Sequence, residues 1–543
     1  MADSARDGVV GGSVGRCYFF VDVDGVVRFC IAKLLSIFIL VFSLFVFLGF
    51  FLEFWWLSVA QIMLLMFVPV VFGRQRSGSF FWGWVIVFLA GLLVFFCVLL
   101  FFKMGLQFFW PTFICLLVSL LLVSVVMGWM RIIDNARWGM YISRVMLFCV
   151  AGGVFYVGFM RHWAAGQSIA MLQALFVFSV LVFSPLDVRG GRFWLVLSGL
   201  VLAFFASNIL AVIDGVGIAY WPRVFQMVFH LVFATALLMF LRVDDQVLAL
   251  VVRAVLLAIL IYTLFLVFTW SGLSEPEHYD WMHNPPLFQH IRHLAYFLCI
   301  GMVTAAWASM AWQGGWQRTA LLMFWLVTTM MLWSGSRGAF LAASVGILIL
   351  LVRFPLRRFA RVWLMILLAG LAAMLVSALF PVDQPGVGWL SAFRRSDQAA
   401  SINQLSSGRL AIWSYLVPFI AERPWFGWGG EGFLAVWEGF PIRQAHNGLM
   451  QLLIEWGVIG AVLFLSIIAW LSFKGGRLYL AHAKAGETSV TLAYGLALLA
   501  ALLALAVTDG IFYYGMPLTF LMIACAFIGG ELIRHQRVAE RVV

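Results

Sequence analysis

Apolar stretches long enough to cross a membrane recur along nearly the whole chain, and short polar segments separate them. A membrane-spanning helix needs about 20 mostly apolar residues. The pattern therefore predicts about 16 transmembrane helices in an all-α, polytopic bundle. The expected helix starts lie near Ile31, Phe54, Phe80, Phe108, Met140, Ser168, Phe193, Arg223, Val247, His293, Thr319, Gly338, Val362, His446, Thr491 and Met516.

Composition supports the same class of protein. Hydrophobic residues make up 64% of the 543 residues and charged residues only 10%. A soluble domain averages about 45–50% apolar and about 25% charged residues, so this chain needs lipid as its solvent. The net charge of +11 is spread over short clusters between apolar stretches. Because no basic face results, we expect no nucleic-acid partner.

The basic clusters also predict an orientation, because short cytoplasmic loops carry an excess of Lys and Arg. Alternate loops contain such clusters, and we place these loops and both termini in the cytoplasm. Residues 1–30 are expected to be a cytoplasmic leader, because they lack the basic-then-apolar order of a cleavable signal peptide. The opposite, outer side then carries two longer connections, 271–291 and 381–445. The second connection contains five tryptophans and is expected to form short helices at the membrane surface. The basic clusters are Arg74 with Arg76, Arg131 with Arg137, Arg189 with Arg192, Arg357 with Arg358 and Arg361, Lys474 with Arg477, and Arg534 with Arg537.

A few ionisable residues lie at the predicted outer ends of the spans, where a substrate could meet them at the lipid boundary: Arg292, Arg337, Arg409 and His446. Arginine offers a planar fork of donors that matches phosphate oxygens, and histidine can take a proton near neutral pH. Together they suit the transfer of a group from a lipid pyrophosphate to a hydroxyl. Arginines at span ends are also common membrane anchors, so the residues alone leave both interpretations open.

Three stretches between about residues 288 and 473 resemble the O-antigen ligase and O-antigen polymerase family of lipid-linked oligosaccharide transferases. The first is Trp333–Ala339, which contains a serine–arginine–glycine motif. The second is Ser407–Trp413, followed by Pro424–Gly429. The third is the pair His446-Asn447, followed by Glu455-Trp456-Gly457. The order and spacing of the three stretches are more specific than any one of them.

The resemblance implies a metal-independent glycosyltransferase without a cofactor. It would move glycan from undecaprenyl pyrophosphate to an acceptor on the periplasmic side of the bacterial inner membrane. In the family's pattern His446 is the catalytic base. Arg337, Arg292 and Arg409 would bind pyrophosphate, although Arg409 could instead brace the loop. Supporting roles are expected for Asn447, Ser336 and Glu455.

The acceptor remains open among the activities of the family. Lipid A–core, as in lipopolysaccharide biosynthesis by an O-antigen ligase, is the expected acceptor. A growing glycan would make the protein a polymerase, and a pilin-like protein would make it an O-oligosaccharyltransferase. A transporter of lipid-linked glycan is the alternative from another class. The expected regions are the leader 1–30, N-terminal helices 31–287, a catalytic region 288–473 that includes loop 381–445, and C-terminal helices 474–543.

Overall fold

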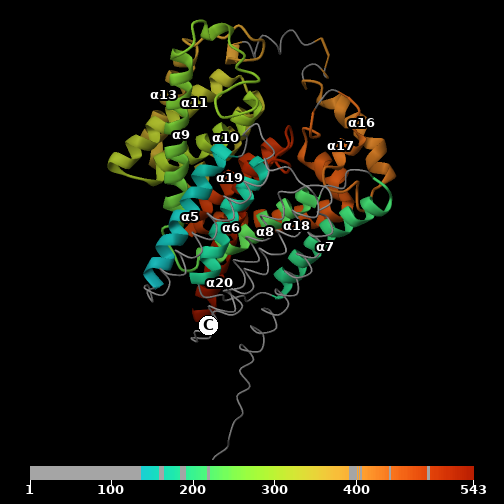
Figure 1. Cartoon of the computed structure of the whole chain (residues 1–543). Coiled ribbons are helices and arrows are strands. Elements are labelled where there is room, and N and C mark those ends of the chain that lie inside the picture. The colour runs from blue at the N-terminus through green and yellow to red at the C-terminus, as the bar shows by residue number, and fades with distance from the viewer. Residues whose placement is uncertain are drawn as a thin grey trace, which may run out of the picture. The chain divides into compact units, whose positions relative to one another are not determined.

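The chain divides into two units, Met1–Val126 and Met127–Val543, and the described residues belong to the second. The first four predicted spans and the 1–30 leader lie outside the described residues. The structure is a computed structural model, shown in Figure 1. It describes residues 136–542 except 158–163, 184–190, 217–220, 391–399, 402, 404–405, 440–441 and 486–488.

The described secondary structure is entirely helical, as predicted (Figure 1). Its long helices each begin within six residues of one of the last twelve predicted starts. They are α5 (Ala136–Val157), α6 (Ala164–Phe183), α7 (Gly191–Ile213), α8 (Trp221–Phe240), α9 (Val247–Ser271), α10 (Ile291–Ala311), α11 (Gly314–Ser334), α12 (Arg337–Arg353), α13 (Leu356–Ser377), α18 (Gly448–Ala485), α19 (Val490–Ala506) and α20 (Gly515–Val542).

Seven of the described helices are both long and apolar enough to cross a membrane: α7, α8, α9, α10, α13, α18 and α20. Two shorter apolar segments, Met140–Phe155 and Val490–Ala506, accompany them. The protein is therefore a multi-pass membrane protein, while the total of about 16 spans stays a prediction. The expected short helices of loop 381–445 are α16 (Arg409–Glu422) and α17 (Gly432–Val436), and the 271–291 connection contains η1 (Pro276–His278).

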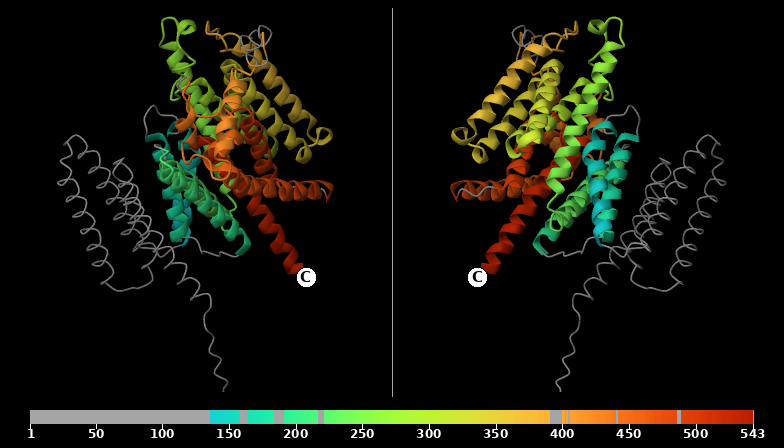
Figure 2. Two further views of the ribbon diagram at one scale, coloured as in Figure 1. Left: turned by 90° about the vertical axis from the view of Figure 1, so that its right-hand side faces the viewer. Right: turned by 90° about the vertical axis from the view of Figure 1, so that its left-hand side faces the viewer.

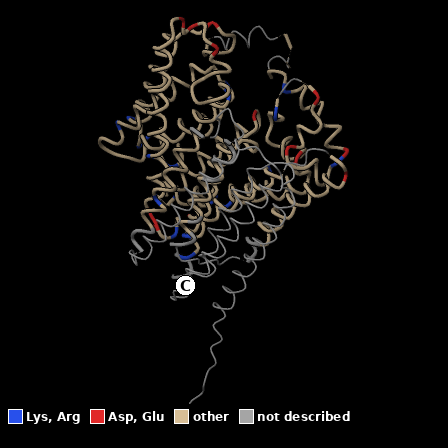
Figure 3. The backbone as a smooth tube through the Cα atoms, in the orientation of Figure 1, with Lys and Arg blue, Asp and Glu red and all other residues tan. Residues whose placement is uncertain are grey.

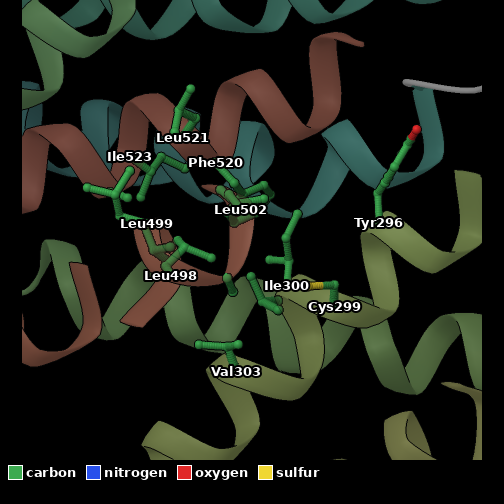
Figure 4. Packing of buried hydrophobic residues seen from close by; sticks show 14 of the residues in the cluster. Tyr296, Cys299, Ile300, Val303, Leu498, Leu499, Leu502, Phe520, Leu521 and Ile523 are labelled. Atoms are coloured by element: carbon green, nitrogen blue, oxygen red, sulfur yellow. The ribbon is translucent and has the colours of Figure 1, made fainter. Parts of the chain in front are cut away.

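Helix α10 forms the centre of the bundle, and 94% of its most apolar stretch is buried. Figure 4 shows Ile300 and Val303 of α10 among leucines of α19 and residues of α20. Close approach of α12 to α19 depends on Gly346, where an added Cβ would lie 2.6 Å from the Ala497 carbonyl oxygen. The hydroxyl of Tyr296, one turn before Ile300, points away from this apolar cluster (Figure 4).

Charged residues are unevenly distributed along the bundle. Figure 3 shows Lys and Arg gathered toward the end where the C-terminus lies, while acidic residues cluster at the opposite end around the α9–α10 connection. This polarity agrees with the predicted division of the loops between two sides. Figure 2 shows α18 lying across the direction of α20, so the segment after loop 381–445 is steeply inclined to its neighbour.

Candidate functional site

A histidine and an aspartate from distant parts of the chain meet where α18 begins and α19 ends. His446 lies just before α18, and Asp509 lies in the turn between α19 and α20. The His446 Nδ1 atom is 3.2 Å from Asp509 Oδ1. Because a carboxylate only accepts hydrogen bonds, a neutral imidazole carries its proton on Nδ1 and keeps the lone pair on Nε2. Within the described part of the chain, no hydrogen bond engages Nε2.

Further polar groups surround the Asp509 carboxylate. Gln444 Nε2 donates to Asp509 Oδ1 at 2.9 Å; it also lies 3.0 Å from His446 Nδ1, but with the proton on Nδ1 it makes no hydrogen bond to the imidazole. The amide of Gly510 donates to the same carboxylate oxygen at 2.9 Å. Burial alone would raise the pKa of Asp509, but the hydrogen bond and charge of His446, together with the nearby Tyr296 hydroxyl and the charge of Arg409, hold that pKa well below its usual range. The carboxylate is therefore ionised beside the imidazole at neutral pH.

Arg409 connects the three arginines singled out from the sequence to this pair through its charge interactions. Arg292 is the second residue of α10, Arg337 the first residue of α12 and Arg409 the first residue of α16. Arg409 feels the charges of the other two arginines and of Asp509. Its burial lowers the pKa of Arg409, and the neighbouring arginines lower it further while Asp509 opposes them. Arg409 is thus within electrostatic reach of two further cations, an arrangement that favours an anionic ligand.

Each of these arginines also lies in the first turn of a helix. Backbone N–H groups at a helix start have no partner within the helix, and the helix dipole adds partial positive charge there. At the start of α12, the N-cap residue Ser336 makes no side-chain capping bond. At the start of α10, His290 caps the helix, with its Nδ1 accepting a hydrogen bond from the Arg292 amide at 3.0 Å. Helix starts of this kind are ready-made anion sites.

Left-handed backbone residues adjoin all three sequence motifs. Gly335, with φ 66°, precedes the α12 start, and Ser407 and Gly408, with φ 58° and 80°, precede α16. His446 itself has φ 50°. A non-glycine residue at positive φ costs about 1–3 kcal/mol and persists only where the surroundings enforce it, which is common at functional sites. The glycines of the motifs thus serve the turns that bring the arginines to the site.

Asn447 and Trp413 fix the backbone at the start of α18. The Asn447 Oδ1 atom accepts a hydrogen bond from the Met450 amide at 3.0 Å and caps the helix, while its Nδ2 donates to the Val507 carbonyl at 2.9 Å. Trp413 Nε1 donates to the Ala445 carbonyl at 3.0 Å. The start of α18 is therefore tied both to the α19–α20 turn and to α16.

Glu455 lies on α18 but in a separate buried cluster. Its Oε2 atom is 3.2 Å from Arg223 Nη2 of α8, and the two side chains are 0% and 1% exposed. No hydrogen bond or ion pair joins Glu455 to His446 or Asp509 among the described residues. Helix α18 breaks just beyond Glu455, at Gly457, whose φ and ψ are 62° and −170°. The side chain of Glu455 reaches the α19–α20 turn only through Arg223, which also donates to the carbonyls of Phe512 and Tyr513.

The loop segment Pro424–Gly429 inserts into the break in α18. The Trp428 amide donates to the Ile454 carbonyl at 2.8 Å on one side of the break. On the other side, the Val458 amide donates to the carbonyl of the proline that opens the segment, at 2.7 Å. The broken helix therefore recovers its missing backbone partners from the loop. This pairing explains why the two motifs Pro424–Gly429 and Glu455–Gly457 occur together.

Three residues of the site escaped the sequence analysis: Asp509, Gln444 and Tyr296. Asp509 ends an apolar run at Val507-Thr508-Asp509-Gly510. A lone carboxylate at a span end is the same kind of signal that identified the arginines. Gln444 and Tyr296 carry no such signal, because their importance depends on contacts across more than 60 residues of sequence.

The comparisons with known proteins agree with this part of the chain. Residues 322–465 match the family model described as O-Antigen ligase. The matched region includes Arg337, Arg409 and His446, whereas Arg292 and Asp509 lie outside it. The resemblance inferred from the sequence motifs is therefore confirmed for the O-antigen ligase-like region.

Two curated relatives carry a provisional description as polysaccharide ligases. One, from Rickettsia bellii (strain RML369-C), is 29% identical over 164 residues, which cover 27% of this chain and 38% of the relative. The other, from Rickettsia conorii (strain ATCC VR-613 / Malish 7), is 25% identical over 187 residues, which cover 31% of this chain and 43% of the relative. The chain thus matches about two-fifths of the length of these relatives.

Proposed function

We propose that this protein is a glycosyltransferase that moves glycan from undecaprenyl pyrophosphate to lipid A–core at the periplasmic face of the inner membrane. The match to the O-antigen ligase family supports the reaction class. The observation that carries the proposal is the pairing of His446 with Asp509, whose charge acts on Arg409 together with the charges of Arg292 and Arg337.

The arginines suit the donor. The two phosphates of a lipid pyrophosphate present several negatively charged oxygens, which guanidinium forks bind through paired hydrogen bonds. The helix starts that carry Arg337, Arg292 and Arg409 add backbone N–H groups and partial positive charge. As the bond between the sugar and the pyrophosphate breaks, negative charge grows on the departing phosphate. Cations already held in place stabilise that charge without reorganisation.

The histidine suits the acceptor. The acceptor's hydroxyl oxygen attacks the anomeric carbon of the sugar, and the bond from that carbon to the pyrophosphate oxygen breaks with its electron pair. His446 Nε2 takes the hydroxyl proton, while Asp509 holds Nδ1 and stabilises the imidazolium that forms. Proton, nucleophile and leaving group are then all accounted for by residues of the site.

A reconstitution with and without acceptor tests the proposal. Purified protein is mixed with undecaprenyl-pyrophosphate-linked glycan in vesicles, and lipid A–core is added to one half of the samples. His446→Ala is compared with His278→Ala. His278 is a suitable control because it also pairs with an aspartate, Asp383, at 2.8 Å, but is 58% exposed. We expect glycan on lipid A–core with the wild type and His278→Ala, and none with His446→Ala.

Other outcomes redirect or refute the proposal. Lengthening of the lipid-linked glycan without lipid A–core would replace the ligase assignment by a polymerase. Transfer only to an added pilin-like protein would indicate an O-oligosaccharyltransferase. If His446→Ala retained full transfer while folding normally, the proposed role of the histidine would be wrong. Movement of intact lipid-linked glycan across the vesicle membrane, without transfer, would indicate a transporter.

A further inference from the structure

Arg223 on α8 is a fully buried arginine whose donors are all engaged inside the protein. Its Nε and Nη2 atoms approach the Glu455 carboxylate at 3.2–3.3 Å. Its Nη1 atom donates to Gln226 Oε1 at 2.9 Å and to the Tyr513 carbonyl at 2.8 Å, and Nη2 donates to the Phe512 carbonyl at 2.6 Å. A guanidinium has five N–H donors, so none is left for a substrate phosphate.

The two carbonyls belong to the turn that carries Asp509. Phe512 and Tyr513 follow Asp509 by three and four residues, before α20 begins at Gly515. Carbonyls outside a helix at this depth need donors, because an unpaired buried carbonyl costs about 1–3 kcal/mol. Arg223 supplies both donors from a single rigid group, and its guanidinium also lies 4.9 Å from the centre of the Tyr513 ring. The course of the turn is therefore set by the position of Arg223.

Glu455 is in turn held by its own backbone. Its carbonyl oxygen, at the break in α18, accepts hydrogen bonds from the Ser207 hydroxyl at 2.8 Å and the Gly429 amide at 3.0 Å. The carboxylate supplies the negative charge without which a buried guanidinium would be very unfavourable. The turn that carries Asp509 has a second attachment, to loop 381–445. There the Tyr513 hydroxyl donates to Glu431 Oε2 at 2.7 Å.

We infer that Arg223 is a positioning residue: anchored by Glu455, it fixes the 509–514 turn and so holds the Asp509 carboxylate in register with His446. The inference rests on the proposed function for its catalytic consequence, but its structural part stands without it. This positioning role differs from a role in binding pyrophosphate, because all five N–H donors of the Arg223 guanidinium are engaged within the protein. It also differs from a contribution to stability alone, because the effect should pass through Asp509.

Two variants separate these roles. Glu455→Gln keeps the shape of the side chain but removes the charge that anchors Arg223. The double variant Arg223→Met with Glu455→Leu removes the pair together, a replacement that often leaves stability nearly unchanged, and deprives the turn of its donors. The matched control is Asp244→Asn, which breaks another arginine–carboxylate pair, Arg144 Nε to Asp244 Oδ2 at 2.6 Å.

The first readout needs no transfer activity. Hydrogen–deuterium exchange of purified protein should show faster exchange of amides in residues 509–514 for Glu455→Gln and for the double variant, but not for Asp244→Asn. Unchanged exchange in the double variant would overturn the inference, whether or not the protein is a glycosyltransferase. Should Glu455→Gln fail to fold, the double variant alone decides this readout.

The second readout is transfer in the Asp509→Asn background. In the wild-type background, the double variant should lower kcat about 100-fold, as displacement of a catalytic group by about 1 Å can do, with little change in the KM for the donor. In the Asp509→Asn background, the same variant should cause less than about a threefold further loss, because both changes disable the same group. Equal losses in the two backgrounds would indicate mere destabilisation and overturn the inference. Absence of transfer by the wild type would refute the proposed function and leave the exchange result standing.

Discussion

Replacing Asp509 by asparagine tests the chemistry of the site most directly. The side chain keeps its size, so the buried volume between α18 and α19 is unchanged. The amide, however, can present its N–H₂ group to His446 Nδ1, which lies 3.2 Å from Oδ1 in the wild type. Nδ1 then carries the lone pair and Nε2 carries the proton. The nitrogen expected to receive the acceptor's proton is thereby blocked.

The expected loss follows from this change of tautomer. General-base catalysis contributes about 10²–10⁴-fold to a rate, and each tenfold corresponds to about 1.4 kcal/mol. Removing both the correct tautomer and the charge that stabilises the imidazolium should therefore cost about 3–5 kcal/mol of transition-state stabilisation. Binding of the donor depends on the arginines, so its KM should change by less than about threefold.

Single-turnover transfer from a labelled lipid-pyrophosphate donor measures the loss without interference from product release. Asp509→Asn is compared with Asp244→Asn, which makes the same chemical change in a buried carboxylate that pairs with Arg144. We expect the control to retain most of its activity. If Asp509→Asn kept more than about a tenth of the wild-type rate, the assignment of His446 and Asp509 as a catalytic pair would be refuted.

Three further predictions concern the arginines, the helix break and the outer loop. Arg337→Lys should lose at least about tenfold in transfer, because a point charge cannot replace a bidentate fork; full activity in a cell-based glycan assay would contradict this. Gly457→Ala should destabilise the protein by about 3 kcal/mol or more, since a Cβ there would collide with the Trp425 backbone and φ is 62°; an unchanged thermal midpoint would show otherwise. Burial raises the pKa of Glu431 to about 7 from 4.5. Because the folded state then prefers the protonated form, stability should be greatest below about pH 4.5 and fall as the pH rises through about 7. Glu431→Gln should abolish that fall in thermal midpoint between about pH 5 and pH 8, and persistence of the fall would assign it to another group.

The helices were largely predictable because hydrophobic length dominates in a membrane. A run of about 20 apolar residues has few alternatives to a spanning helix, so the starts of α9 and α10 fall within two residues of prediction. The same reasoning failed to foresee the break in α18, since Glu455 and Gly457 sit inside a long apolar pattern. Only the partners supplied by loop residues 424–429 make that break stable, and they are distant in sequence.

The candidate site was predictable in part, for a similar reason. Arg337, Arg409 and His446 stand out because few ionisable residues lie at the predicted outer ends of these spans and because short motifs surround them. Asp509 belongs to the α19–α20 connection, one helix further along the chain than α18, and has no motif of its own. Arg223 looked like a residue at the start of a span, and its role emerges only from the carbonyls of Phe512 and Tyr513 that it contacts.

The insertion of Pro424–Gly429 into α18 has a consequence for biosynthesis and for engineering. The ribosome makes this loop segment before it makes the helix, so the loop is complete while its hydrogen-bonding partners are still unmade. The loop can complete its structure only after α18 has entered the membrane. A chimera that exchanges loop 381–445 between two proteins should therefore assemble only if residues 454–459 are exchanged with it.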